Sequence, residues 1–161
     1  MKHFDRLIFL DQDDTTRAPM AAALMESKYL LGPLKIFSRG LVVLFPEPVN
    51  QKAEAIMASK GMTMKDHTAT QLSQEDITER TLILTMEDKQ KAKIWTDYSD
   101  ARHVYTIAEY IGLQGDLLPL YGEDLPGYGE CFETLDALTN GLVICLNEEE
   151  LKRDNRPQHD D

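Results

Sequence analysis

Apolar residues along this chain form two kinds of pattern, short continuous runs and longer stretches with helical spacing. The short runs have the length of buried strands, and polar or turn-forming residues follow each of them. They predict four strands, at RLIFL (6–10), PLKIFSRG (33–40), RTLILTM (80–86) and ARHVYTI (101–107).

The stretches between these runs predict helices. In APMAAALMESKYLL (18–31), Met20, Leu24 and Leu31 recur at helical spacing, and Pro19 suits a first helical turn. The other predicted helices are PVNQKAEAIMASKG (48–61, ending at Gly61), MEDKQKAKIW (86–95), AEYIGL (108–113) and a final helix from Pro126 with Cys131, Leu135, Leu138 and Leu142 on one stripe.

Strands that alternate with helices predict a three-layer α/β/α fold around a four-stranded parallel sheet. We expect a single domain over residues 1–152 and a charged C-terminal tail over 153–161, with the charged end fraying from about Glu149. Ligands of such folds bind at the carboxyl ends of the strands, so the end of the first strand is the default site.

Composition narrows the function classes. The 161 residues carry a formal net charge of −11, which disfavours nucleic acid and anionic membranes as partners. No apolar run has membrane-spanning length, and the N-terminal run is too short for a secretory signal, so a cytoplasmic protein is expected. Cys131 and Cys145 lack metal-ligand spacing and are interpreted as small apolar residues.

The segment LIFLDQDDTTRAPM (7–20) holds the candidate chemistry. Loop amides and the start of a helix attract anions, and the Arg17 guanidinium can bind two phosphate oxygens. However, Asp11, Asp13 and Asp14 place carboxylates in this same loop, so Arg17 could instead pair with an acid nearby.

Several separate segments resemble the low-molecular-weight protein tyrosine phosphatase family, which includes thiol-dependent arsenate reductases. Its loop, C-x-G-N-x-C-R-S-P, is similar to the loop here, where Arg17 and Pro19 keep their spacing. The other similar segments, in order, are FSRG (37–40), MKDHTATQLSQED (64–76), LILTMEDKQKAKI (82–94) and YGEDLPGYGECFETLDAL (121–138). The resemblance covers residues 5–145 and implies the phosphotyrosine protein phosphatase I-like fold.

The resemblance also implies a set of site residues. The phosphate loop would comprise Asp11, Gln12, Asp13, Asp14, Thr15, Thr16, Arg17 and Ala18. Ser38 would support this loop, and Phe45 and Tyr121 would line the substrate cleft. The family's nucleophilic cysteine is replaced by Asp11, and its general-acid aspartate by Pro119, which has no proton to donate.

Three hypotheses about activity remain open at this point, the third being residual slow phosphatase activity through water held by Asp11. The first is a catalytically impaired relative, without a cofactor, that has a binding or regulatory role toward a phosphorylated or other protein partner. In it, the Asp11 carboxylate accepts hydrogen bonds from loop amides or Arg17 in place of the missing anion. The second is an active phosphatase with Asp11 as nucleophile, because D-x-D-x-T (11–15) also resembles haloacid-dehalogenase-like phosphatases. It would need Mg²⁺ at Asp11 and Asp13.

Overall fold

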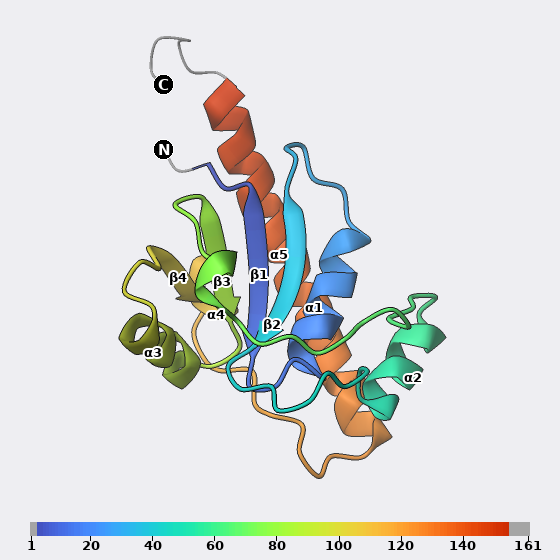
Figure 1. The fold of residues 1–161 in the computed structure, drawn as a ribbon. Helices are drawn as coiled ribbons and strands as arrows, with labels where there is room; N and C mark the ends of the chain where they lie inside the picture. Colours follow the sequence, from blue (N-terminus) through green and yellow to red (C-terminus); the bar gives the residue numbers. More distant parts are fainter. Residues whose placement is uncertain (1–2, 155–161) are drawn as a thin grey trace.

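A four-stranded, fully parallel sheet forms the centre of the computed structural model, which describes residues 3–154. Its strand order is β2-β1-β3-β4. The strands are β1 (Arg6–Asp11), β2 (Lys35–Gly40), β3 (Thr81–Thr85) and β4 (His103–Thr106). The predicted α/β fold with four parallel strands is confirmed (Figure 1).

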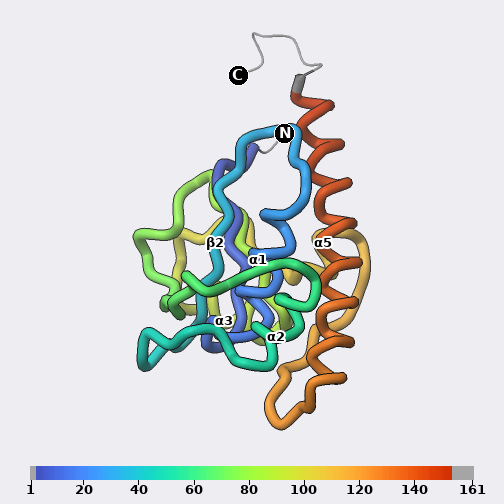
Figure 2. Tube along the Cα trace, turned by 90° about the vertical axis from the view of Figure 1, so that its right-hand side faces the viewer, coloured from blue at the N-terminus to red at the C-terminus, as the bar shows by residue number. Residues whose placement is uncertain are grey.

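Helices cover both faces of this sheet. They are α1 (Arg17–Glu26), α2 (Gln51–Ser59), α3 (Asp88–Asp97), α4 (Ile107–Tyr110) and α5 (Leu125–Asp154), and a 3₁₀ turn spans Gln74–Asp76. α1 and the long α5 lie together on one side of the sheet, and α3 lies on the other (Figures 1 and 2). The loops that follow the carboxyl ends of the strands gather at one end of the molecule.

The apolar run in β1 explains why this strand is central. Its side chains alternate between two cores, with Leu7 and Phe9 packed in the α1 and α5 layer and Ile8 and Leu10 in the α3 layer. All four side chains are fully buried. A strand covered on both faces has a continuous apolar sequence, which is why its period of two is hidden.

The first helix is shorter than predicted. It ends at Glu26, and the hydroxyl of Ser27 donates to the carbonyl of Leu24 at 2.6 Å. Leu31, predicted on the buried stripe, therefore lies outside the helix and is 45% exposed. Its backbone N–H donates to the side chain of Asn147 in α5. The continuation to Leu31 was wrong because the helical spacing extends past the residue that caps the helix.

The last helix is longer than predicted. The buried stripe from Cys131 to Leu142 is confirmed, but the helix continues to Asp154 instead of fraying from Glu149. The Tyr110 hydroxyl donates to Glu149 at 2.8 Å, and Arg153 pairs with Glu150, so side-chain contacts extend into its last turns. The predicted tail over 153–161 thus begins in helix, and 155–161 lie outside the described residues.

Length alone does not make α5 a membrane helix. Its 30 residues include many charged side chains. Over residues 3–154, no helix is both long and apolar enough to cross a bilayer.

Candidate functional site

The segment between β1 and α1 lies at the carboxyl end of the sheet. It packs against the end of β2, where a Cβ atom on Gly40 would come within 2.8–2.9 Å of the backbone of Asp13 and Asp14. The following segment, residues 41–50, runs along the same loop. The amides of Val42 and Asn50 donate to the carbonyls of Gln12 and Thr15, at 3.0 and 2.9 Å.

Asp11, the last residue of β1, lies beneath this loop with no exposed surface. Its Oδ1 accepts a hydrogen bond from the amide of Asp14 at 2.5 Å, and its Oδ2 accepts one from the amide of Ala18 at 2.9 Å. The predicted internal arrangement of the Asp11 carboxylate is therefore the one the structure has, with loop amides as its donors.

Burial dominates the acidity of this carboxyl group. It raises the pKa of Asp11 to about 6, against an ordinary value of 3.8. The Ala18 amide, the Arg17 charge and the Asp14 amide each lower the pKa, and the Asp14 charge raises it. The carboxyl is thus mostly ionised at neutral pH and takes up a proton in mildly acidic solution.

Asp14 holds the loop to the rest of the site. Its φ of 61° is in the left-handed region, and its side chain has no exposed surface. Its Oδ2 accepts from the amide of Thr70 at 3.0 Å, and its carbonyl lies 2.7 Å from Nε2 of His67. Burial raises the pKa of the Asp14 carboxyl overall, and the neighbouring Ser38 hydroxyl acts to lower it. These three partners come from β2 and the 60–73 segment, and together they order the loop.

Arg17, the first residue of α1, is only 2% exposed. Its Nη1 donates to Oε2 of Glu87 and to the carbonyl of Leu117, both at 2.7 Å. Glu87, at the start of α3, is 5% exposed. The guanidinium charge is therefore offset by a buried carboxylate, and the acid that pairs with it comes from β3–α3 rather than from the loop.

A pocket of about 260 Å³ opens above the loop. Asp13 is one of its lining residues, and its Oδ1 accepts from the hydroxyl of Thr15 at 2.7 Å. Burial raises the pKa of the Tyr121 and Tyr128 phenols, and the charge of Asp13 adds to the shift in each. The pocket is lined by Asp13, Thr15, Thr16, Arg17, Glu47, Pro48, Asn50, Pro119, Leu120, Tyr121 and Tyr128.

The structure brings most of the sequence-predicted residues together. Residues 11–18 connect the end of β1 to the start of α1, Ser38 lies beside Asp14, and Pro119 and Tyr121 line the pocket. Phe45 is 69% exposed and is not among the residues that line this pocket.

The sequence did not point to every residue of the site. The sequence did not indicate that Glu87 is the carboxylate that binds Arg17. Glu47 and Tyr128 line the pocket and were not singled out. The position of Glu87 directly after a buried strand was a usable signal, because strand ends meet at this edge of the sheet.

The residues proposed for Mg²⁺ have other partners. Both oxygens of Asp11 bind amides, and Oδ1 of Asp13 binds Thr15. Within residues 3–154, no three His, Cys, Asp or Glu side chains form a metal-binding group. A Mg²⁺ ion ligated by Asp11 would have to displace the hydrogen bonds that this carboxylate already accepts.

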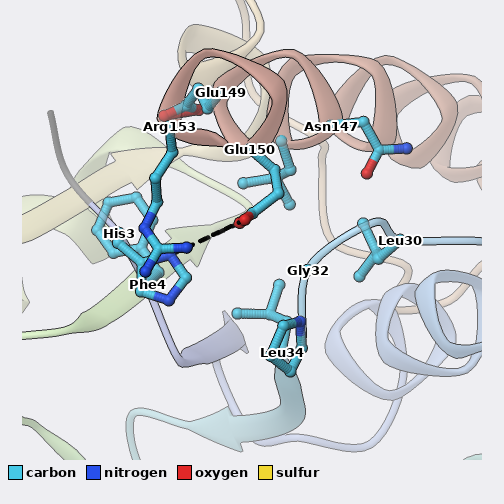
Figure 3. A pocket seen from close by; sticks show the side chains of 11 residues that line it. His3, Phe4, Leu30, Gly32, Leu34, Asn147, Glu149, Glu150 and Arg153 are labelled. Carbon is cyan, nitrogen blue, oxygen red and sulfur yellow. Dashed lines mark hydrogen bonds and ion pairs between the residues drawn. The ribbon is translucent and has the colours of Figure 1, made fainter. Parts of the chain in front are cut away.

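A second, much smaller cavity of about 40 Å³ lies at the opposite end of β1 (Figure 3). Glu150 of α5 points into it and pairs with Arg153 at 3.1 Å and with Nδ1 of His3 at 3.7 Å. A Cβ atom on Gly32 would come within 2.5 Å of the same carboxylate. Residues of the N-terminal segment and of α5 line this cavity, which lies far from the strand ends that carry the loop.

Comparison with known sequences agrees with the fold. A family model described as low molecular weight phosphotyrosine protein phosphatase matches residues 6–156. The low molecular weight protein-tyrosine-phosphatase PtpB of Staphylococcus haemolyticus (strain JCSC1435) is 29% identical over 130 residues, which are 81% of this chain and 91% of that protein. A protein-arginine-phosphatase of Geobacillus stearothermophilus is 30% identical over 114 residues, or 70% and 76% of the two chains.

Solved structures give the same result. The low molecular weight protein tyrosine phosphatase from T. tengcongensis superposes with a TM-score of 0.82 at 30% identity, over 88% of this chain and 99% of that one. The YwlE arginine phosphatase from Geobacillus stearothermophilus superposes with a TM-score of 0.87 at 27% identity, over 94% and 99%.

Proposed function

The chain belongs to the low molecular weight phosphotyrosine protein phosphatase family, and from that premise we propose that it is a catalytically impaired member. In this proposal it is a pseudophosphatase that serves as a binding or regulatory module. The observation that carries the proposal is the burial of Asp11, whose two carboxylate oxygens already accept hydrogen bonds from the loop amides of Asp14 and Ala18.

The burial and the hydrogen bonds of Asp11 argue against its acting as a nucleophile. To attack phosphorus, one oxygen would have to leave its amide donor and approach a phosphate that also carries negative charge. Two like charges about 4 Å apart repel by about 4 kcal/mol at an effective dielectric constant of about 20. The Arg17 guanidinium offsets little of this repulsion, since it is already paired with the Glu87 carboxylate at 2.7 Å.

The thiol near the site does not restore the family's chemistry. Cys131 of α5 is 5% exposed, and burial raises its pKa to about 11. The thiolate is the nucleophilic form, so this cysteine is almost entirely unreactive at neutral pH. The resemblance also puts Pro119, which lines the pocket and has no proton to donate, at the position of the family's general acid.

An assay for hydrolysis of phosphorylated peptides tests the proposal directly. The wild-type protein should show no turnover above background, with or without Mg²⁺, on either a phosphotyrosine or a phosphoarginine peptide. The competing hypothesis, an Asp11 nucleophile assisted by Mg²⁺, expects metal-dependent turnover that disappears in Asp11→Asn. Clear metal-dependent hydrolysis of that kind would overturn the proposal.

Restoring the thiol separates the two missing groups. We expect Asp11→Cys to give at most weak activity, since a general acid contributes about 10²–10⁴-fold and none is placed at Pro119. Activity of Asp11→Cys near that of the active relatives would show that another acid serves the loop. The other acids near this position, Asp116, Glu123 and Asp124, do not line the pocket, and Asp116 accepts from the amide of Asp88 at 2.9 Å.

A further inference from the structure

Two exposed apolar segments flank the pocket above the loop. On the β2–α2 side, Leu44 is 81% and Phe45 is 69% exposed, and Val42 is half-exposed. On the α4–α5 side, Leu118 and Tyr121 are 70% and 69% exposed. Both segments lie at the lower end of the molecule, beyond the carboxyl ends of the strands (Figures 1 and 2). Large apolar side chains gathered around a concave site are typical of a surface that contacts another protein.

The pocket between these segments is acidic. Asp13 and Glu47 contribute carboxylates to its lining, and Arg17 is its one charged donor within the described lining. The charge of Arg17 is offset by Glu87 at 2.7 Å. The pocket therefore attracts a cation and repels a phosphate group.

The tyrosine rings that line the pocket also favour a positively charged group. Tyr121 and Tyr128 both line it. At its edge, the chain's own Lys52 places Nζ 5.8 Å from the centroid of the Tyr128 ring, while donating to the carbonyl of Glu123 at 2.6 Å. An ammonium or guanidinium group over a tyrosine face is stabilised by the ring quadrupole. Carboxylates beside tyrosine rings thus suit a lysine or arginine side chain.

We propose that the two exposed apolar segments and the pocket between them bind a basic segment of a protein partner, with a lysine or arginine side chain in the pocket lined by Asp13 and Glu47. Apolar residues that flank the basic side chain would pack against Leu44 and Phe45. The inference deepens the proposed function and rests on it, because a cation can occupy the pocket only where the loop below holds no phosphate. A phosphorylated segment would bring charge of the wrong sign to these two carboxylates.

The experiment uses the full chain labelled with ¹⁵N and a set of nine-residue peptides. Each peptide has a central residue between two leucines in a glycine and serine background, and the central residue is arginine, lysine, glutamine, glutamate or phosphotyrosine. Amide shifts in a two-dimensional NMR titration report both the affinity and the surface that is contacted. We expect the arginine and lysine peptides to shift amides of residues 13–17, 47–50 and 120–128, with the glutamine peptide about tenfold weaker.

Matched charge variants test whether the pocket is responsible. The double variant Asp13→Asn with Glu47→Gln should weaken the arginine peptide about tenfold. The control double variant Glu75→Gln with Glu79→Gln removes the same charge from exposed positions outside the pocket and should leave the affinity unchanged. Equal weakening by both variants would mean that only the net charge attracts the peptide, and the inference would be wrong.

The remaining outcomes separate this inference from the proposed function. If the phosphotyrosine or glutamate peptide binds as tightly as the arginine peptide, or if no peptide shifts the named amides, the cation site is refuted while the absence of turnover can still hold. If the wild-type protein hydrolyses aryl phosphates, the proposed function fails, and the inference fails with it.

Discussion

Asp11 and Asp13 lie two positions apart on one loop and have opposite surroundings. Asp11 has no exposed surface and both of its oxygens accept backbone hydrogen bonds, whereas Asp13 lines an open pocket and binds only the hydroxyl of Thr15. The same residue type thus stabilises the loop at one position and faces possible ligands at the other. The difference teaches that the carboxylates of this loop are not one group with one role.

A parallel contrast holds for the two buried charges around the loop. Asp11 accepts hydrogen bonds from neutral amides, while Nη1 of Arg17 donates to the Glu87 carboxylate and to one carbonyl. A carboxylate that accepts hydrogen bonds from neutral amides keeps its net charge. A guanidinium paired with a carboxylate forms an ion pair with no net charge. The buried side of the loop is therefore negative, and the variants below disturb the contacts of Asp11 and Arg17.

The largest expected effect is at the buried ion pair. Glu87→Ala leaves the Arg17 guanidinium buried with only the Leu117 carbonyl as its partner and should destabilise the protein by about 3–5 kcal/mol. Urea unfolding measures the loss. Asp88→Ala, at the exposed neighbouring position, is the control and should change the free energy of unfolding by less than about 1 kcal/mol.

Removing the internal carboxylate should cost a similar amount. Asp11→Ala leaves the amides of Asp14 and Ala18 without an acceptor, at about 1–3 kcal/mol for each unpaired buried group. If Asp11 stands in for an anion, inorganic phosphate should then raise the melting temperature of Asp11→Ala and leave that of the wild type unchanged. Equal phosphate effects on both proteins would contradict this interpretation.

The pKa of Asp11 predicts a pH dependence of stability. Because the pKa is about 6 in the folded protein against 3.8 ordinarily, the folded state holds its proton more tightly than the unfolded state. The contribution of this group is therefore fully present below pH 3.8 and is lost as the pH rises through 6, by about 3 kcal/mol in all. Asp11→Asn lacks this titration.

Urea unfolding of wild type and Asp11→Asn at half-unit steps from pH 4 to 7 isolates that contribution. The difference in unfolding free energy between the two proteins should shift in favour of the variant as the pH rises, with most of the change below pH 6.5. A difference that stays constant over this range would show that Asp11 is not the group that titrates.

The smallest expected effect is at the partly exposed Asp13. Asp13→Asn should change the free energy of unfolding by no more than about 0.5 kcal/mol, because one oxygen of the side chain is replaced by an amide at a partly exposed position. A loss as large as that in Asp11→Ala would remove the contrast between the two aspartates.

Much of the fold follows from local sequence. The run RLIFL and the three later runs have strand length, and the helical stretches between them require parallel connections, so the sheet could be predicted without the structure. The ends of helices could not, since Ser27 stops α1 through a contact that the apolar spacing does not encode. For α5, Glu149 and Glu150 looked like a fraying end until their partners Tyr110 and Arg153 were placed.

The sequence by itself determined which residues form the loop, because residues 11–18 are consecutive and lie between a strand and a helix. Its resemblance to the family also puts the Asp11 carboxylate at the position of the family's nucleophile. Only the tertiary structure decided what the charges do there. Arg17 pairs with a glutamate 70 positions away, and Thr70 and His67 hold Asp14 from another segment. Coulomb energies and burial depend on distances in space, and a sequence gives those distances only between near neighbours in the chain.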